Sequence, residues 1–274
     1  RKDTYLAGHH LILAHAKAYR VYDSEFRKTQ KGVVGIANNC DWREPLTDSQ
    51  QDKAAAQRAL EFYFGWFTDP LFFGEYPESM RKSLNDVLPS FSAEETALVK
   101  NSIDFIGLNH YTTFMAADAN GNIETPFEYA NHGFAEDQGV NLYTDPAWEV
   151  TEMGWPVVPY GLYKLLKWID QRYEHPVIYV TENGCSFNDT MVNGEVDDSK
   201  RIEYLKSYLA ACNKAIEDGV DVRGYFVWSF LDNFEWALGY AKRFGLHYVD
   251  FKTLERTPKK SAKWFKGVIE NNGL

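Results

Sequence analysis

The stretch Val177-Ile-Tyr-Val-Thr-Glu-Asn-Gly184 places a carboxylate and an Asn-Gly pair directly after a run of apolar and β-branched residues. Such a run is typical of a strand that is buried on both faces, and the carboxyl ends of parallel strands carry the chemistry of α/β proteins. Glu182 therefore lies where a nucleophile or a general base is expected. An alternative is that Asn183 and Gly184 form an ordinary hairpin turn beside a solvated Glu182.

Three more apolar runs without alternation predict further buried strands. The four expected strands cover residues 32–38, 104–109, 176–181 and 222–230. Apolar residues at helical spacing predict helices over residues 4–26, 51–67, 93–101, 160–174, 200–217 and 259–271. Ser92 and Glu95 form a capping box at the start of the third helix, and Gly219 ends the fifth. The order is a leading helix followed by four strand-helix units.

This alternation predicts a parallel α/β fold, either a doubly wound sheet or a (β/α)8 TIM barrel. A whole barrel can be built from about 250 residues, so the length of 274 residues would allow one. Only four strands are found, however, and residues 112–151 form a long insertion. No linker rich in Pro, Gly or Ser divides the chain. We therefore expect a single domain over residues 1–274, which supplies half of a barrel.

Composition limits the possible partners. The net charge of −10 argues against nucleic acid, and no apolar stretch approaches the roughly 20 residues of a membrane span. The three cysteines, Cys40, Cys185 and Cys212, show neither a metal-binding nor a disulfide spacing. With no signal peptide visible, we expect a reducing, cytoplasmic location. The chain also lacks an initiator Met, as if it were cut from a longer protein.

Polar and aromatic residues follow every expected strand. They are Asn38 and Asn39, Asn109 to Tyr111, Glu182 and Asn183, and Trp228 followed by Asp232, Asn233, Phe234, Glu235 and Trp236. Carboxylates and amides can bind sugar hydroxyls, and flat rings can lie under the C–H faces of a sugar. Core packing or a salt-bridged loop remains the alternative for each of these residues taken alone.

Four motifs resemble glycoside hydrolase family 1, the β-glucosidase family. They are Thr181-Glu-Asn-Gly184, Gly107-Leu-Asn-His-Tyr111, Val227-Trp-Ser-Phe-Leu-Asp-Asn-Phe-Glu-Trp236 and Gly239-Tyr-Ala-Lys-Arg-Phe-Gly-Leu246. The resemblance runs from the first helix to the last. It implies the C-terminal half of a (β/α)8 barrel, and neither a metal nor an organic cofactor.

The same resemblance implies roles for eight residues. Glu182 matches the nucleophile, Tyr111 the phenol that hydrogen-bonds it, and Asn109 a side chain near the sugar. Four residues match the binding site of the non-reducing sugar, namely Trp228, Glu235, Trp236 and Phe244, and Trp155 matches an aromatic on the leaving-group side. A carboxylate at Glu235 would repel a sugar phosphate, so unphosphorylated β-glycosides are expected. His110 should alternate away from the site, and His9, His10 and His15 show no metal-binding pattern.

A retaining glycosidase needs a second carboxyl group about 5 Å from the nucleophile. In the family this acid/base Glu lies in a Thr-Phe-Asn-Glu-Pro segment, which does not occur here. The resemblance therefore implies a complementary N-terminal barrel half, or self-association, as a partner. An alternative is a catalytically incompetent half barrel, or pseudo-enzyme, that acts as a binding or structural module. A third possibility is that the open barrel binds a flat apolar ligand.

Overall fold

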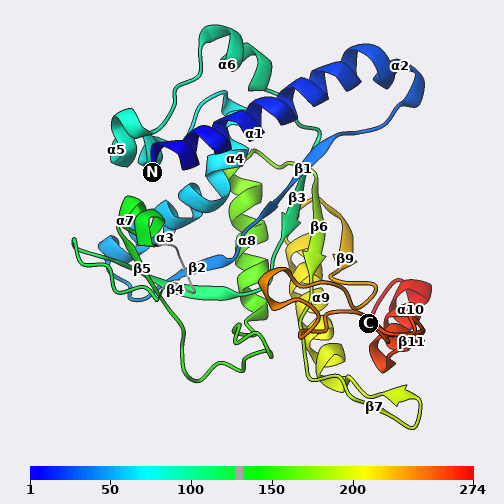
Figure 1. Ribbon diagram of the computed structural model, residues 1–274. Coiled ribbons are helices and arrows are strands. Elements are labelled where there is room, and N and C mark those ends of the chain that lie inside the picture. The colour runs from blue at the N-terminus through cyan, green and yellow to red at the C-terminus, as the bar shows by residue number, and fades with distance from the viewer. Residues whose placement is uncertain (127–131) are drawn as a thin grey trace.

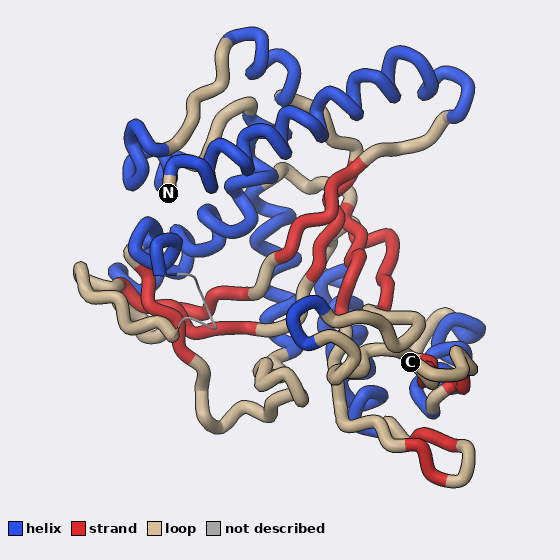
Figure 2. Tube along the Cα trace, viewed as in Figure 1, coloured by secondary structure: helices blue, strands red, loops and turns tan. Residues whose placement is uncertain are grey.

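A four-stranded parallel sheet forms the centre of the molecule (Figures 1 and 2). The computed structural model describes residues 1–126 and 132–274. The strands are β1 (Gly35–Asn39), β3 (Phe105–Asn109), β6 (Ile178–Asn183) and β9 (Val222–Val227), in the order β1-β3-β6-β9. All three pairings are parallel. The four expected strands are therefore confirmed, with ends that differ by up to three residues.

The order of the strands distinguishes the two expected folds. A doubly wound sheet reverses its strand order at a switch point. Here the strands follow one another across the sheet in chain order, without a reversal. Right-handed connections then place the connecting helices on one face of the sheet, as in a barrel. The sheet is that of half a (β/α)8 barrel.

Two long amphipathic helices cover the outer face of this sheet. Helices α8 (Pro159–Arg172) and α9 (Ser199–Glu217) pack on each other and on the strands. Buried strand residues alternate toward them, and the shared core includes Ile106, Leu108, Ile178, Val180, Leu162, Leu165, Leu166, Ile169, Tyr204, Leu205, Tyr208 and Cys212. The apolar residues that predicted these helices therefore form the main core.

Most of the remaining helices precede α8 in the chain, and one follows α9. The leading helix consists of α1 (Lys2–Val21), a π-helical turn (Tyr22–Phe26) and α2 (Arg27–Gln30). The second expected helix consists of α3 (Gln50–Leu60), a π-helical turn (Glu61–Gly65) and α4 (Trp66–Phe73). Then follow α5 (Glu78–Leu84), a 3-10 turn (Asn85–Val87), α6 (Ala93–Val99) and α7 (His132–Gln138), and α10 (Lys260–Asn271) ends the chain. The Ser92 and Glu95 capping box is present.

Three small sheets were not predicted from the sequence. The largest joins β2 (Trp42–Pro45), β4 (Thr113–Asp118) and β5 (Val140–Tyr143). The others pair β7 (Met191–Val192) with β8 (Glu195–Val196), and β10 (His247–Val249) with β11 (Arg256–Pro258). Strand β2 follows β1 after two residues, and β4 follows β3 after three. The first of these sheets therefore extends the carboxyl ends of two central strands.

The fourth strand ends earlier than expected. The apolar run predicts a strand to residue 230, but β9 ends at Val227. The chain then leaves the sheet and pairs with a later segment, because Ser229 N donates to Phe244 O at 3.1 Å and Leu246 N donates to Ser229 O at 2.8 Å. A 3-10 turn (Trp236–Leu238) follows in the same loop. This departure carries Trp228 and Glu235 over the end of the sheet.

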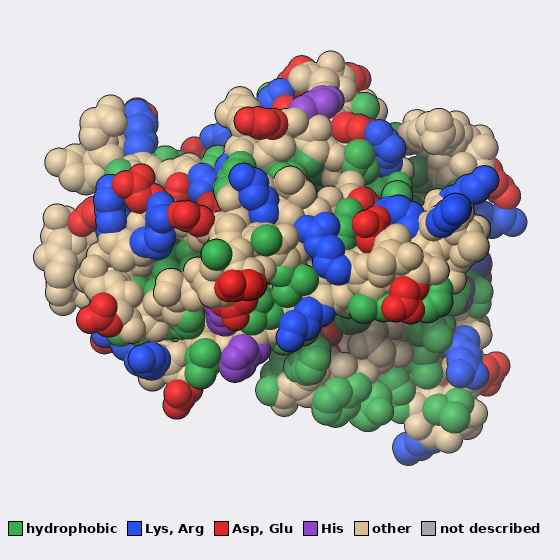
Figure 3. Space-filling view, turned by 90° about the horizontal axis from the view of Figure 1, so that it is seen from above, with side chains coloured by type: hydrophobic (Ala, Val, Ile, Leu, Met, Phe, Trp, Pro, Cys, Tyr) green, Lys and Arg blue, Asp and Glu red, His purple; other side chains and the backbone are tan. Residues whose placement is uncertain are grey.

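The inner face of the sheet is partly open. Small residues and rings alternate there, with Phe105 against Tyr179 at 5.0 Å between ring centroids. On β9 the side chain of Phe226 is 57% exposed, and that of Phe230 in the following loop is 66% exposed. Figure 3 shows hydrophobic side chains gathered at one edge of the face that it displays, while charges of both signs are scattered over the rest.

Three other sequence predictions concern the surroundings of the protein. Among the described residues, no helix combines the length and the apolar character that a membrane crossing requires. The three cysteines are buried and free. The cytoplasmic location and the single domain stay predictions.

A buried ion network fixes the loops that follow β6 and β9. Arg201 on α9 contacts Asp189 at 2.8 Å and Asp198 at 2.5 Å, and all three side chains are buried. Lys259, before α10, contacts Asp189 at 2.5 Å and Asp232 at 2.8 Å. Burial lowers the pKa of Lys259, and the nearby Arg201 lowers it further. The ion pairs therefore connect the loops after β6 and β9 with the starts of α9 and α10.

We expect Arg201→Met to lower the free energy of unfolding by about 3–5 kcal/mol, because it leaves two buried carboxylates without this partner. Urea denaturation followed by circular dichroism measures the loss. The matched control is Arg81→Met, which removes an exposed ion pair with Glu75 and should leave the midpoint nearly unchanged. Equal losses in the two variants would contradict the structural role of the network.

A close contact between strand ends explains Gly184. A Cβ atom at Gly184 would lie 1.8 Å from the backbone oxygen of Trp228. We expect Gly184→Ala to push the ends of β6 and β9 apart and to destabilise the protein by about 1–3 kcal/mol, as overpacking does. Urea denaturation and the tryptophan fluorescence spectrum measure the change.

The control for this variant is Gly267→Ala in α10. Apart from its own helix backbone and chain neighbours, no heavy atom of the described residues lies within 4 Å of a Cβ atom built at Gly267. Because alanine is the better helix former, this change should stabilise by up to about 1 kcal/mol. A Gly184→Ala variant as stable as the wild type would show that the strand ends adapt freely.

Candidate active site

One cavity of about 470 Å³ lies at the carboxyl ends of the central strands. It is lined by Asn39, Asp41, Arg43, Tyr63, Asn109, Tyr111, Thr112, Phe114, Trp155, Glu182, Trp228, Glu235, Trp236 and Phe244. All eight residues that the sequence singled out are among them. They come from β3, β6 and the loops after β3, β5 and β9, and the parallel sheet brings them to one edge.

Glu182 stands near the end of β6 and accepts a hydrogen bond from Tyr111. The Tyr111 hydroxyl donates to Glu182 Oε2. Burial raises the pKa of Tyr111 far above its ordinary value, and the bond to Glu182 raises it further. The phenol therefore stays protonated and acts as a donor, and Oε1 of Glu182 has no share in this bond.

Asn109 is oriented by the neighbouring strand. The Thr181 hydroxyl on β6 donates to Asn109 Oδ1 at 2.6 Å. Because the amide oxygen is occupied, the amide nitrogen is the group that Asn109 offers to the cavity. Tyr111, two residues later, is held by Asp41, whose Oδ1 accepts from the backbone nitrogens of Tyr111 and Thr112 at 3.3 and 3.2 Å.

His110 and Asn183 point away from the cavity, as strand alternation requires. His110 is fully buried, and its Nδ1 lies 2.9 Å from the backbone oxygen of Cys40. Asn183 is also fully buried and donates to the backbone oxygen of His110 at 2.8 Å and to the Tyr204 hydroxyl at 3.0 Å. The structural role expected for His110 is confirmed, and the Asn-Gly hairpin alternative is wrong because Asn183 continues β6.

The other expected structural histidines also have local partners. His9 Nδ1 lies 2.9 Å from the Tyr76 hydroxyl, and His15 Nε2 lies 2.8 Å from the backbone oxygen of Ser102. No group of three or more metal-ligating side chains is found among residues 1–126 and 132–274.

Glu235 and Trp228 form the wall on the β9 side. Burial raises the pKa of Glu235, a hydrogen bond with Trp228 opposes the rise, and the nearby Glu182 carboxyl adds to it. The Glu235 residue is only 9% exposed. Two carboxyl groups therefore share one pocket, and Glu182 makes the ionisation of Glu235 less favourable.

Aromatic rings line the rest of this wall. Trp155 lies 5.3 Å from the Tyr111 ring and 6.0 Å from the Phe244 ring, between centroids. Phe244 is buried, whereas Trp236 is 80% exposed and lies at the rim. The four partly or fully buried rings of Tyr111, Trp155, Trp228 and Phe244 give the cavity flat apolar surfaces beside its carboxylates.

Six lining residues were missed as site residues in the sequence. Asn39 is among the residues that follow the first expected strand, and Asp41 and Arg43 come shortly after it. Their position after a strand end is the sequence signal that could have identified them as site residues. Tyr63 follows α3 in a π-helical turn, and Phe114 lies on β4, so no local pattern connects them with the cavity. Thr112 donates to the backbone oxygen of Pro156 at 2.6 Å and holds the Trp155 loop.

The chain is similar in sequence and structure to known proteins. The sequence model of glycosyl hydrolase family 1 matches residues 1–274. Beta-glucosidase 42 of Arabidopsis thaliana is 46% identical over 283 residues, which cover 99% of this chain and 57% of the relative. Beta-glucosidase 4 of Oryza sativa subsp. japonica is 44% identical over 275 residues, which cover 98% of this chain and 56% of the relative.

A solved structure agrees with the sequence relatives. A mutant of the rice Os3BGlu6 beta-glucosidase, in a covalent complex with Glc, superposes with a TM-score of 0.88 and 43% identity, covering 96% of this chain and 56% of that one. The chain thus spans a little over half the length of the relatives that it matches, in agreement with half of a (β/α)8 barrel. On these matches over nearly its whole length, the chain belongs to glycosyl hydrolase family 1.

Proposed function

We propose that this chain is the nucleophile-bearing half of a retaining β-glycosidase that hydrolyses unphosphorylated β-glycosides. The observation that carries the proposal is the hydrogen bond from Tyr111 to Glu182 within the cavity that also holds Trp228 and Glu235. A nucleophilic carboxylate, hydroxyl acceptors and a flat ring are the groups that such a reaction requires.

In this proposal Glu182 attacks the anomeric carbon. Tyr111 binds Oε2, so Oε1 is the attacking oxygen. The C–O bond to the leaving group breaks as the bond to Oε1 forms, and water later releases the sugar from Glu182. A covalent complex with Glc is present in the rice relative's mutant structure, which supports the same course here.

The charge of the cavity supports a neutral sugar. Glu182, Glu235 and Asp41 are all acidic and all line it. Like charges at short range repel strongly in a partly desolvated pocket, so a phosphate on the sugar bound beside Glu235 would be disfavoured. Trp228 and Trp236 supply apolar surface for an unphosphorylated ring.

The acid/base group is proposed to come from a complementary barrel half. Of the other two carboxylates in the described cavity, Asp41 holds two backbone nitrogens and Glu235 bonds Trp228. In this proposal both carboxylates act as acceptors that position their partners, and the acid/base group is a third carboxyl group. The relatives are nearly twice as long as this chain, which supports a second half that supplies the missing carboxyl group.

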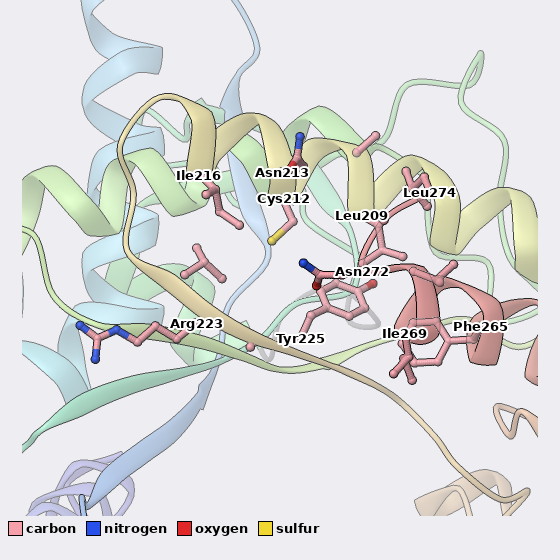
Figure 4. Close-up of a pocket in the computed structure, with 15 residues that line it drawn as sticks. Leu209, Cys212, Asn213, Ile216, Arg223, Tyr225, Phe265, Ile269, Asn272 and Leu274 are labelled. Carbon is pink, nitrogen blue, oxygen red and sulfur yellow. The ribbon is translucent and has the colours of Figure 1, made fainter.

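The surface beside β9 suits this partner. A groove of about 600 Å³ lies between α9 and α10 across the start of β9 (Figure 4). Its apolar lining includes Leu209, Cys212, Ile216, Phe265 and Ile269. A second groove of about 850 Å³ runs along Phe226 and Phe230. Because β9 is the last strand of the sheet, a strand and a helix of the complementary half would close both grooves.

A binding or structural module is the second candidate. The observation that favours it is that the described cavity has sugar-binding groups but lacks an unengaged second carboxyl group. Loss of general acid and base help costs roughly 10²–10⁴ in rate, so the isolated chain should act poorly on ordinary glycosides.

The labelling experiment distinguishes the two candidates. A 2-deoxy-2-fluoro-β-glucoside with a dinitrophenyl leaving group needs little protonation, so we expect one glycosyl adduct on the 31.6 kDa chain, mapped to Glu182. Intact-mass and peptide mass spectrometry measure it. Glu182→Gln should stay unlabelled, and the control Glu270→Gln on α10 should label normally. Sugar binding without any adduct would favour the module.

The docking proposal has its own test. We mix the chain with the portion of the Arabidopsis relative that it does not match, and follow the mass by sedimentation velocity. A one-to-one complex is expected, and Phe226→Asp combined with Phe230→Asp should weaken it at least tenfold, because the charges would be buried. Phe73→Asp, at an exposed ring on α4, is the control. A complex of two copies of this chain would instead establish self-association.

A further inference from the structure

Arg43 is a buried cation that the proposed reaction does not use. It lies on β2, lines the cavity and is only 4% exposed. Its guanidinium carbon lies 5.2 Å from the Tyr63 ring centroid and 5.1 Å from the Phe114 ring centroid. These two rings come from different elements, so the tertiary structure holds the planar group at a fixed place in the cavity wall.

The guanidinium has few acceptors. Its Nη1 donates to the backbone oxygen of Trp42 at 3.5 Å, and across residues 1–126 and 132–274 no carboxylate lies within ion-pair distance of it. An arginine carries five N–H donors, and a buried charge without a counter-ion costs free energy. The two acids nearest in sequence have other partners. Glu44 accepts from Lys164 Nζ at 2.7 and 2.8 Å, and Asp41 accepts from the backbone nitrogens of Tyr111 and Thr112. The remaining donors of Arg43 are therefore available to acceptors from outside this part of the chain.

The position of Arg43 in the cavity places it on the side where the leaving group of a substrate would lie. Strand β1, which leads into β2, is separated from β6 by β3, and adjacent strands lie about 4.8 Å apart. Arg43 is four residues beyond the end of β1, so it lies on the β1 side of the cavity, away from β9. Trp228 and Glu235 lie on the opposite side, after β9. A sugar bound between Glu182 and β9 would direct its leaving group toward β1 and β2.

We propose that Arg43 is a specificity-determining residue that selects leaving groups bearing an anionic group, such as a carboxylate. The inference rests on the proposed function, because it assumes a glycoside with its sugar beside Trp228 and Glu235. Packing against the Tyr63 and Phe114 rings restricts the orientations of the guanidinium, and a carboxylate can accept two parallel hydrogen bonds from its N–H edge. Glu182 and Glu235 would discourage anions at the sugar end, while Arg43 would bind one at the leaving-group end.

Asn39 and Tyr63 support the same wall. Asn39 Nδ2 donates to the Tyr63 hydroxyl at 3.1 Å, which fixes one of the two rings against Arg43. Burial raises the pKa of Tyr63, so its phenol remains neutral beside the guanidinium. The site for the leaving group would therefore combine a fixed cation with two aromatic faces.

A matched pair of ligands tests the proposal. The pair is 4-carboxyphenyl β-glucoside and its methyl ester, which differ only in the charge of the leaving group. Titration calorimetry on this chain measures both dissociation constants. We expect the carboxylate to bind about tenfold more tightly than the ester at low ionic strength, and the preference to shrink as salt rises. Equal affinity for the two ligands would overturn the inference.

Variants assign the preference to Arg43. Arg43→Met keeps an apolar stem between the two rings and should reduce the tenfold preference to about one, while the ester still binds within about threefold of the wild type. Arg43→Lys retains the charge but not the planar edge, so it should keep part of the preference. Arg81→Met, at an exposed arginine on α5, should retain all of it. A full preference in Arg43→Met would overturn the assignment.

The outcomes separate this inference from the proposed function. Binding of the ester without a preference for the carboxylate contradicts only the role of Arg43. Failure of both glucosides to bind contradicts the sugar site itself, and the role of Arg43 with it. Thermal unfolding of Arg43→Met and Arg43→Lys checks that both variants are folded.

Discussion

The buried charges of Arg201, Lys259, Asp189, Asp198 and Asp232 are the interaction on which the rest of the site depends. They join the loops after β6 and β9 to the starts of α9 and α10. Charges buried in this way are costly unless every partner is present, so the loops have little freedom to rearrange separately. The wall of the cavity on the β9 side, which contains Trp228, Glu235, Trp236 and Phe244, belongs to the second of these loops. Asp232, which belongs to the same motif as Glu235, is thereby a positioning residue.

Acidic and basic side chains are not evenly distributed over the cavity lining, because different strands carry them. Glu182 occupies the middle and Glu235 the β9 side, where Glu182 raises the pKa of Glu235, and the third acid, Asp41, follows β1. The single basic side chain of the lining, Arg43, lies at the β2 side between two rings. Neutral sugar chemistry at one end is therefore compatible with anion recognition at the other, because the central strands separate the two regions.

The edge strands and the exposed apolar rings of the chain have one geometric cause. A parallel barrel satisfies its edge strands only when the sheet closes on itself, and β1 and β9 are edges here. Exposed rings such as Phe226 and Phe230 lie beside one of these edges. The relatives, being almost twice as long, have the chain length to provide further strands. The half barrel explains both the apolar grooves and the absence of an unengaged acid/base group from the described cavity.

The sequence alone predicted the parallel strands and the helices between them, because apolar runs are local patterns. Its resemblance to a known family indicated the eight residues that line one cavity. Strand alternation likewise predicted that His110 faces the core. Only the tertiary structure decided that β9 stops at Val227, since the following residues find backbone partners near Phe244 instead. It also decided that Tyr63, Phe114 and Arg43 meet at the cavity. Those contacts join elements that are far apart in the chain. Because they are stabilised by packing between elements, no local sequence pattern predicts them.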